Sequence, residues 1–249
     1  MNRLLSGALA LGLAAVAALT PSAASATSFD FTKYSSGNTF TVDGLTVKVT
    51  AWHANDSNTS ANSVDSISAA TLGVYQGAGL GDLYGTDKDS NGTHQIDNVG
   101  GGADFLMLQF SQDVSLNSIS RNVYSISGAT CCDSDAAYWG DIGNLLGSPS
   151  SSASIDLTKY VLDESTFTSL AGGKSASTTA LSDTGLASVW LVSAAFNQSN
   201  DAFKLSGISV SPAPISSPAP EPASWAMMIV GFGAVGAGMR SRRRTLAAA

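Results

Sequence analysis

The sequence predicts an all-β fold: a two-sheet antiparallel sandwich, jelly-roll-like, between a helical N-terminal signal peptide and a short C-terminal membrane segment. Three observations support this prediction. Short runs in which apolar and polar residues alternate recur between turn-rich segments, as expected for half-buried strands. Asp, Ser, Thr, Asn and Gly are abundant, and they favour turns and strand edges over helices. The longest apolar runs lie near the two ends of the chain.

The N-terminal residues 1–26 have the organisation of a secretory signal peptide. Arg3 supplies a positive charge, and residues 4–19 form a nearly uninterrupted apolar segment that a proline ends. Ala24-Ser25-Ala26 then provides the small-x-small pattern that a signal peptidase accepts. We therefore expect cleavage after Ala26, a mature chain that starts at Thr27, and export of the protein.

Residues 27–211 are long enough for one β-sandwich domain with its own core. The clearest local signal is a hairpin in which residues 39–42 and 45–52 flank the turn dipeptide Asp43-Gly44. The remaining segments predicted to be extended are 29–31, 66–75, 105–110, 114–119, 136–139, 189–194 and 203–210.

Four irregular features are also predicted in this domain. Gln112-Asp113 is expected to be a turn that separates two strands, and residues 77–81 are expected to form a tight glycine turn. Gly207, between two apolar residues of a strand, indicates a bulge. Residues 157–170 are the one place in the domain where a helix is expected.

The C-terminal 38 residues divide into a linker and a membrane-directed segment. Residues 212–219 form an extended Pro/Ala/Ser linker, and residues 220–244 follow, with five more residues, 245–249, as a tail. The apolar segment at about 225–239 spans only about 22 Å as a helix, against a hydrocarbon core of about 30 Å. The arginines that follow it are expected on the cytoplasmic side.

This C-terminal segment closely resembles the PEP-CTERM sorting signal, in its PEPxxWA variant, of exported proteins of Gram-negative bacteria. The residues that carry the resemblance are Pro220, Glu221, Pro222, Trp225, Ala226, Arg240, Arg242, Arg243 and Arg244, with a glycine-rich span between them. The resemblance implies transient insertion in the inner membrane, cleavage near the Pro-Glu-Pro by an exosortase, and passage through the periplasm to the outer surface or extracellular matrix. It also implies an association with exopolysaccharide and biofilm.

The charge of the mature domain limits its partners. Residues 27–219 hold seventeen Asp and one Glu against six Lys and one Arg, a net charge near −11, whereas the whole chain is at −7. This charge argues against nucleic acid and anionic lipid as partners and favours cations.

A candidate calcium loop lies at residues 87–98. Asp87, Asp89 and Asn91 alternate as the opening ligands of a calcium loop do, a glycine follows, and Asp97 lies close to the position of the last ligand. The twelfth position is an asparagine and no flanking helices are evident, so an EF-hand is not expected. A solvated Asp/Asn turn explains the same pattern equally well, and calcium binding is therefore one of two open interpretations.

A second resemblance covers roughly residues 73–140. A Gly-Leu-Gly element, a His-x-x-Asp-Asn element that ends at Asn98, and an Asp-Phe strand start at Asp104 are similar to a pattern of many exosortase-sorted surface proteins. This resemblance implies a shared sandwich scaffold and no particular activity.

The chain has two cysteines, Cys131 and Cys132, which are adjacent. Their Cα atoms would lie about 3.8 Å apart, below the usual range for a disulfide, so a vicinal bridge would be strained. Free thiols and an intermolecular bridge are the alternatives. A stiffened loop is favoured over redox catalysis because no Cys-x-x-Cys motif is present.

We expect a protein without enzymatic activity, structural or carbohydrate-associated. The alternative is a secreted hydrolase acting on polysaccharide through paired carboxylates among Asp97, Asp104, Asp133 and Asp135. With two histidines a three-histidine zinc site is excluded, and no Gly-x-Ser-x-Gly nucleophile motif occurs. Ice binding would require a regular array of threonines, which the sequence lacks.

Overall fold

The computed structural model describes residues 25–55, 66–85, 94–99, 102–125, 132–146, 155–214 and 222–246. Residues 24–213 form one compact body, which is described here separately from the C-terminal helix. The predicted signal peptide lies outside the described residues except for Ser25 and Ala26, and the first strand of the body begins at Thr27.

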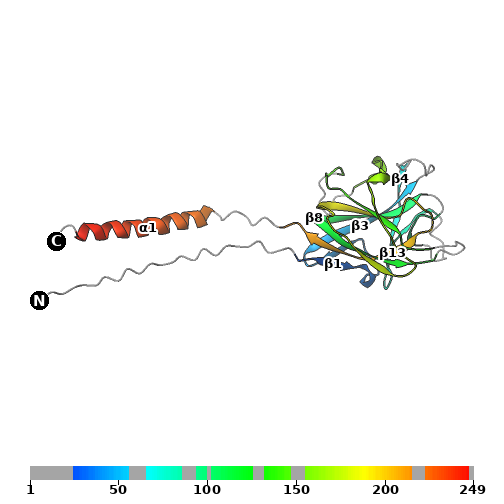
Figure 1. The fold of residues 1–249 in the computed structure, drawn as a ribbon, viewed down its shortest axis with the longest axis horizontal. Coiled ribbons are helices and arrows are strands. Elements are labelled where there is room, and N and C mark those ends of the chain that lie inside the picture. The colour runs from blue at the N-terminus through cyan, green and yellow to red at the C-terminus, as the bar shows by residue number, and fades with distance from the viewer. Residues whose placement is uncertain are drawn as a thin grey trace. The chain divides into compact units, whose positions relative to one another are not determined.

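In the residues that the structure describes, the body is built from β-strands joined by turns and three single-turn 3-10 helices (Figure 1). The strands are β1 (Thr27–Asp30), β2 (Thr39–Val42), β3 (Leu45–Asn55), β4 (Ser66–Ala69), β5 (Thr71–Tyr75), β6 (Gly79–Leu83), β7 (Ile96–Asp97), β8 (Ala103–Val123), β9 (Ala136–Gly140), β10 (Thr168–Leu170), β11 (Ser177–Ala180), β12 (Ala187–Ala194) and β13 (Ala202–Pro212). The 3-10 helices are Phe31–Lys33, Leu157–Lys159 and Glu164–Thr166, and the helix α1 (Pro222–Leu246) follows the body. The predicted all-β antiparallel class is confirmed, and the sheet is not closed.

The predicted β2–β3 hairpin is confirmed, with the turn at Asp43 and Gly44. Both residues have positive φ, 50° and 80°, which a two-residue hairpin loop of type I′ requires. The register pairs Val42 with Leu45 and Thr39 with Lys48. Asp tolerates this backbone region better than most residues, and glycine adopts it freely, so the dipeptide fixes the turn locally.

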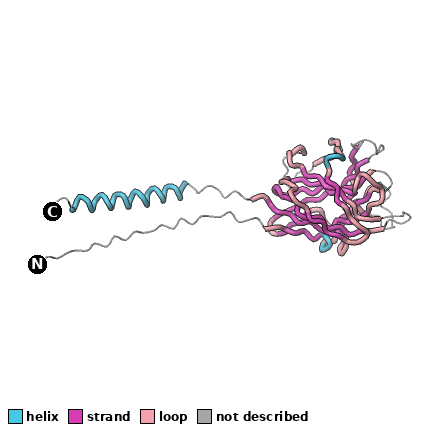
Figure 2. The backbone as a smooth tube through the Cα atoms, viewed as in Figure 1, coloured by secondary structure: helices cyan, strands magenta, loops and turns pink. Residues whose placement is uncertain are grey.

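The strands lie in two layers (Figure 2), and hydrogen bonds join the long strand β8 to strands of both layers. Its first half pairs with β3 on one edge and β12 on the other, whereas its second half pairs with β13 and β11. Gln112 and Asp113 lie exposed at the crossing, so the predicted turn at these residues is wrong. Strand pairing continues before and after these two residues, with β3 and β12 before them and mainly with β13 and β11 after them. The polar pair therefore marks the point where the strand passes from one layer to the other.

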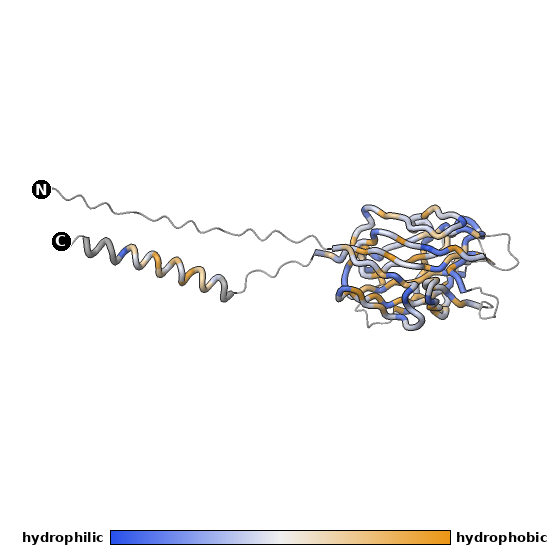
Figure 3. Tube along the Cα trace, turned by 90° about the horizontal axis from the view of Figure 1, so that it is seen from below, coloured by the Kyte–Doolittle hydropathy of each residue, from blue (hydrophilic) through white to orange (hydrophobic). Residues whose placement is uncertain are grey.

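The main core lies between the two layers. β3 contributes Val47 and Val49, β8 contributes Leu106 and Leu108, and the facing layer contributes a set of buried apolar residues. That set includes Phe29, Leu80, Ile96, Leu116, Ile119, Phe203, Leu205, Ile208 and Val210. Figure 3 shows apolar and polar residues alternating along the strands, as the period of two requires.

A second core covers the outer face of the first layer. Phe105 and Met107 of β8 point away from the main core and pack with Leu157, Leu162 and other buried residues of the segment before β10. β8 is therefore buried on both faces between residues 103 and 110.

The helix predicted over residues 157–170 is wrong. Two single 3-10 turns and the short strand β10 occupy this segment. Asp156 and Asp163 are the N-cap residues of the two turns, and each accepts a hydrogen bond from the backbone N–H two residues on. Each turn ends after three residues. Tyr160 and Phe167 then continue in extended conformation and pack on the second core.

A five-residue element occurs twice. Asp30-Phe31-Thr32-Lys33-Tyr34 and Asp156-Leu157-Thr158-Lys159-Tyr160 both form a 3-10 turn capped by the aspartate, with a buried apolar second residue. In each copy the lysine lies within 3.5 Å of the aspartate carboxylate. Both lysine–aspartate pairs are exposed, so they contribute little stability.

The register of β13 shifts between Leu205 and Gly207, which confirms the predicted bulge. The glycine turn predicted at residues 77–81 is shorter than expected. Gly77 has a φ of 80°, but β6 begins at Gly79 and buries Leu80 in the main core.

Helix α1 carries the residues predicted to enter the membrane. Its apolar side chains between Trp225 and Met239 are exposed. Within the residues that the structure describes, no helix is both long and apolar enough to cross a membrane. The membrane segment predicted at about 225–239 lies in α1 and does not meet this condition.

Truncation of the indole at the centre of the main core tests this architecture. Trp190 is 1% exposed, and its indole N–H donates to the carbonyl of Ala187 at 3.1 Å. We expect Trp190→Ala to lower the free energy of unfolding by about 3–5 kcal/mol, because it leaves a cavity and an unpaired carbonyl. Urea denaturation followed by circular dichroism measures the change. The exposed Lys174→Ala is the control, and an equal loss in both variants would contradict this packing.

Candidate cation site

Two segments far apart in sequence meet at one end of the sandwich. Residues 132–135 precede β9, and residues 195–201 connect β12 to β13. Asp133 N–H donates to Asn200 O at 3.1 Å, and Ala202 N–H donates to Asp133 O at 3.0 Å. These bonds form a parallel bridge between Asp133 and Asp201, which holds the backbones of the two segments together.

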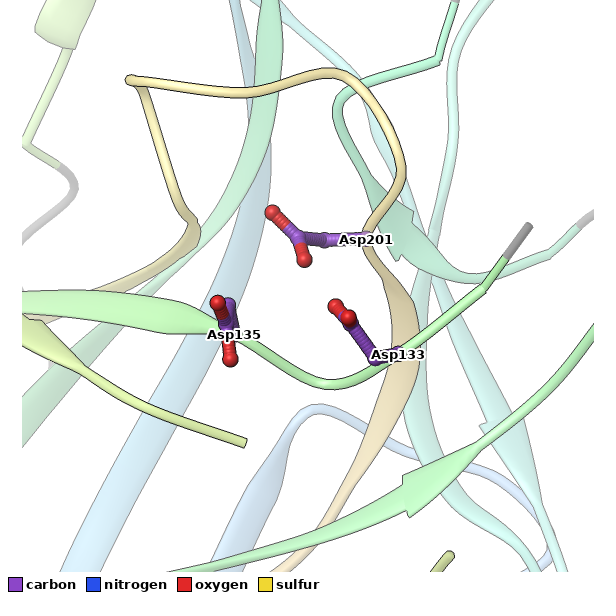
Figure 4. A group of neighbouring side chains, drawn as sticks. All are labelled: Asp133, Asp135 and Asp201. Carbon is purple, nitrogen blue, oxygen red and sulfur yellow. The ribbon is translucent and has the colours of Figure 1, made fainter. Parts of the chain in front are cut away.

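Three carboxylates converge at this junction (Figure 4). One oxygen from each of Asp133, Asp135 and Asp201 lies within 4.8 Å of the other two. Asp201 is fully buried, and the other two are partly buried. The Oδ1 atom of Asp133 is buried and has no hydrogen-bond partner. An oxygen in this state costs free energy unless a proton or a cation reaches it.

Side-chain amides surround the carboxylates. Asn98 Nδ2 donates to Asp201 Oδ2 at 2.6 Å, and Gln198 Nε2 donates to Asp135 Oδ2 at 2.6 Å and to Asp201 Oδ1 at 3.1 Å. Asn200 Nδ2 lies 3.3 Å from Asp133 Oδ2. Each amide also carries an oxygen, and carboxylate and amide oxygens are the ligands that calcium prefers.

The carboxylates influence one another's protonation. Burial raises the pKa of Asp201 to about 7, and the neighbouring carboxyl group of Asp133 acts in the same direction. The amides of Asn98 and Gln198 lower the pKa, but by less. A buried carboxyl group beside a second carboxylate ionises less easily, so Asp201 keeps its proton to higher pH unless a cation replaces it.

Arg121 binds the backbone of the segment that carries Asp133 and Asp135. Its guanidinium is fully buried and donates to the carbonyls of Ser134, Leu170 and Ala171 and to the hydroxyl of Thr179. Burial lowers the pKa of the guanidinium, whereas the charges of Asp135 and Asp201 raise it. Three carboxylates beside one guanidinium leave an excess of negative charge when all are ionised, which suits a divalent cation.

The sequence pattern placed the calcium site elsewhere. Asp87, Asp89 and Asn91 lie outside the described residues, so that loop stays a prediction. Asp97 is described: its carboxylate accepts from Val99 N–H at 2.9 Å and caps a turn. It is not among the three carboxylates that converge.

Asp104 pairs with a histidine. Its carboxylate lies 2.7 Å from Nδ1 of His53, and the ring of Tyr84 stacks on the imidazole at a centroid distance of 3.9 Å. Burial raises the pKa of Asp104, and the contact with His53 and the backbone N–H of Asp97 lower it. The four acidic residues considered for a hydrolase are thus divided among a turn, this pair and the three-carboxylate cluster.

Cys132 is buried and forms a disulfide. The other cysteine of the sequence, Cys131, lies outside the described residues, so the vicinal pairing stays a prediction.

The residues predicted for sorting lie at and before α1. Pro220 and Glu221 are outside the described residues, as is Ala24 of the signal cleavage site. Pro222 begins α1, and Trp225, Ala226 and Arg240 have exposed side chains. The backbone of Arg242, Arg243 and Arg244 continues the helix.

Sequence reasoning missed Asp201 and Gln198. They lie in the Asn- and Ser-rich segment before β13, which has no metal-binding spacing of its own. The sequence held one weak signal of a metal site: Asp133 and Asp135 are separated by a single residue, as neighbouring ligands of a calcium loop are. Two such residues do not make a complete ligand set.

Comparison with known proteins identifies the C-terminal segment. The family of the PEP-CTERM protein-sorting motif matches residues 218–244, which confirms the resemblance found in the sequence. No curated protein and no solved structure matches the chain. The motif covers a small part of the chain and implies an exported protein that an exosortase processes at the membrane.

The raised pKa of Asp201 predicts that stability depends on pH. Because the folded state holds this proton more tightly than the unfolded chain, the contribution is complete below about pH 4 and is lost as the pH rises through about 7. In EDTA we expect the melting temperature to fall between pH 4.5 and 7.5, by at least roughly 2–4 °C, the equivalent of about 1 kcal/mol.

The variant Asp201→Asn has no such proton and should show a flatter profile. The matched control is Asp183→Asn, an exposed residue whose φ of 54° asparagine also tolerates. Parallel profiles for the chain and for Asp201→Asn would contradict a proton held by Asp201 at raised pKa.

Proposed function

We propose that the chain is an exported, non-enzymatic component of the cell surface or extracellular matrix. An exosortase would remove its C-terminal segment and leave the β-sandwich as the working part. The role proposed for that body is structural or carbohydrate-associated, linked to exopolysaccharide and biofilm. The observation that carries the proposal is the sorting motif at residues 218–244.

The division of the chain supports processing near the motif. The last strand of the body, β13, ends at Pro212. The next residue, Ala213, still donates a backbone hydrogen bond to Asp113 O at 2.8 Å. The motif begins at residue 218, so cleavage near Pro220 would leave every strand of the body intact. Likewise, cleavage after Ala26 would leave β1 complete, since this strand begins at Thr27.

We further propose that calcium binds Asp133, Asp135 and Asp201. Oxygen donors from two separate segments would be joined by the ion, which would lock the connection between β12 and β13 to the start of β9. An exported acidic body gains stability from such a link, because the ion neutralises carboxylates that otherwise repel one another.

The hydrolase alternative stays an untested prediction. The cluster of three carboxylates favours a cation over acid–base catalysis, since amide donors and Arg121 already occupy much of its surroundings. Turnover of an exopolysaccharide, abolished by one Asp→Asn change, would overturn the non-enzymatic role.

Calcium titration tests the cation site. We expect calorimetric heat from calcium with the chain and a rise in unfolding free energy of about 2.7 kcal/mol at a calcium concentration one hundred times the dissociation constant. Asp133→Asn and Asp135→Asn should remove both effects, because each deletes a ligand charge and keeps the shape. Magnesium serves as the comparison ion.

Asp87→Ala and Asp89→Ala separate this site from the loop indicated by the sequence. Loss of the calcium heat in these two variants, with Asp133→Asn unaffected, would move the site to residues 87–98. Absence of calcium heat in the unaltered chain would refute both sites.

Mass spectrometry of the mature protein tests the sorting route. In cells that contain the exosortase, we expect a chain that starts at Thr27 and ends close to the Pro220-Glu221-Pro222 segment. In cells without the enzyme, the C-terminal segment should be retained. A full C-terminal segment in both strains would contradict processing.

A further inference from the structure

A polar groove lies on the outer face of the second layer, away from the three carboxylates. It has a volume of about 330 Å³, and β1, β8 and β13 form its floor. Most of the side chains that line it are short and polar: Ser28, Asp30, Thr32, Ser118, Ser120, Asn122, Ser206 and Ser209. This volume is at the lower end of the range for small-ligand sites, about 300–1,000 Å³.

The strand register explains why the groove exists. Ser28, Ser209 and Ser118 are directly opposite one another on β1, β13 and β8. In the next row Gly207 lies between Asp30 and Ser120, so the centre of that row has no side chain. The register of β13 shifts on both sides of this region, between Leu205 and Gly207 and between Ser209 and Val210. The hollow therefore follows from a bulged strand with a central glycine.

Several hydroxyl groups in the groove have unused hydrogen-bonding capacity. Ser120 bonds the hydroxyl of Thr178 at 2.8 Å, and Asn122 donates to Ala78 O at 2.8 Å. Among the described residues, the hydroxyls of Ser28, Ser118, Ser206 and Ser209 make no such bond. Each hydroxyl can donate one hydrogen bond and accept two.

The charge of the groove limits its ligand. Among the described residues, Asp30 is the one ionisable residue that lines it, and hydrogen bonds from Thr32 lower its pKa. The exposed Lys33 lies 3.4 Å from this carboxylate, so the groove itself holds little net charge, within a domain whose net charge is near −11. No lysine or arginine lines it, and Phe29, its one aromatic residue, is 1% exposed. An anionic polymer would be repelled, and an apolar or lipid ligand would leave the hydroxyls unpaired.

We propose that this groove binds an uncharged, hydroxyl-rich ligand, a short segment of a neutral glycan. The ligand's hydroxyls would pair with the hydroxyls of Ser28, Ser118, Ser206 and Ser209, and its lack of charge suits a groove whose one carboxylate is already paired with Lys33. The inference rests on the carbohydrate association proposed above and names the surface and the class of glycan. Without an exposed aromatic ring for stacking, recognition depends on hydrogen bonds and gains strength from the length of the polymer.

Affinity electrophoresis of the purified chain in gels that contain dextran, with maltoheptaose as a soluble competitor, tests the proposal. We expect dextran to retard the chain, maltoheptaose to reverse the shift, and alginate, an anionic polymer, to cause none. The double variant Ser118→Leu/Ser209→Leu should weaken retardation about tenfold or more, because it removes two hydroxyls and fills the groove.

Two controls keep the result interpretable. Ser66→Leu makes the same change at an exposed position of β4 in the other layer and should bind normally. Ser28→Leu, at an exposed position on the rim, should weaken retardation even if the double variant fails to fold, which its melting curve reveals.

Three results would overturn the proposal that the groove binds a neutral glycan. These are no retardation by dextran, equal retardation of all variants, and stronger retardation by alginate than by dextran. Self-association of the chain that Ser118→Leu/Ser209→Leu changes, without any glycan effect, would assign the surface to a second copy of the chain instead. None of these outcomes alters the processed mass, so failure of the groove is distinguishable from failure of the sorting route.

Discussion

The strand β8 is the element on which the rest of the structure depends. One continuous backbone gives hydrogen bonds to β3 and β12 in the first layer and to β13 and β11 in the second. The two layers are therefore joined by a shared ladder as well as by apolar packing. Because the first half of β8 is buried on both faces, a change at Phe105 or Leu106 would disturb one of the two cores.

The same arrangement gathers polar groups at one end of the sandwich. β7 pairs with the start of β13, which brings Asn98 against Asp201, while the backbone N–H of Asp97 reaches the carboxylate of Asp104. A short segment thus touches both the histidine–aspartate pair and the carboxylate cluster. Polar groups at such depth are costly unless they are paired, and the network of amides and carboxylates provides most of that pairing.

Much of the fold and less of the site could be predicted from the sequence. The hairpin at Asp43-Gly44, the bulge at Gly207 and the buried strand at residues 105–110 depend on local patterns, and all three are confirmed. The helix expected at residues 157–170 failed because the turns that Asp156 and Asp163 cap end after three residues. The residues that follow, Tyr160 and Phe167, are extended and pack on the second core, which composition does not reveal. Asp201 could not be assigned to Asp133 and Asp135, because it lies 68 and 66 positions after them and no spacing rule links the three residues.

The sequence by itself determined the C-terminal sorting motif, because a short linear signal is recognised by the order of its residues and needs no folded partner. It also determined the β class, since alternating polarity and turn residues act within a few positions of one another. The tertiary structure alone decided that β8 joins both layers, that three aspartates from two segments converge, and that serines of three strands line one groove. The physical reason is that strand pairing and register act between residues far apart in the chain, and no local pattern encodes them.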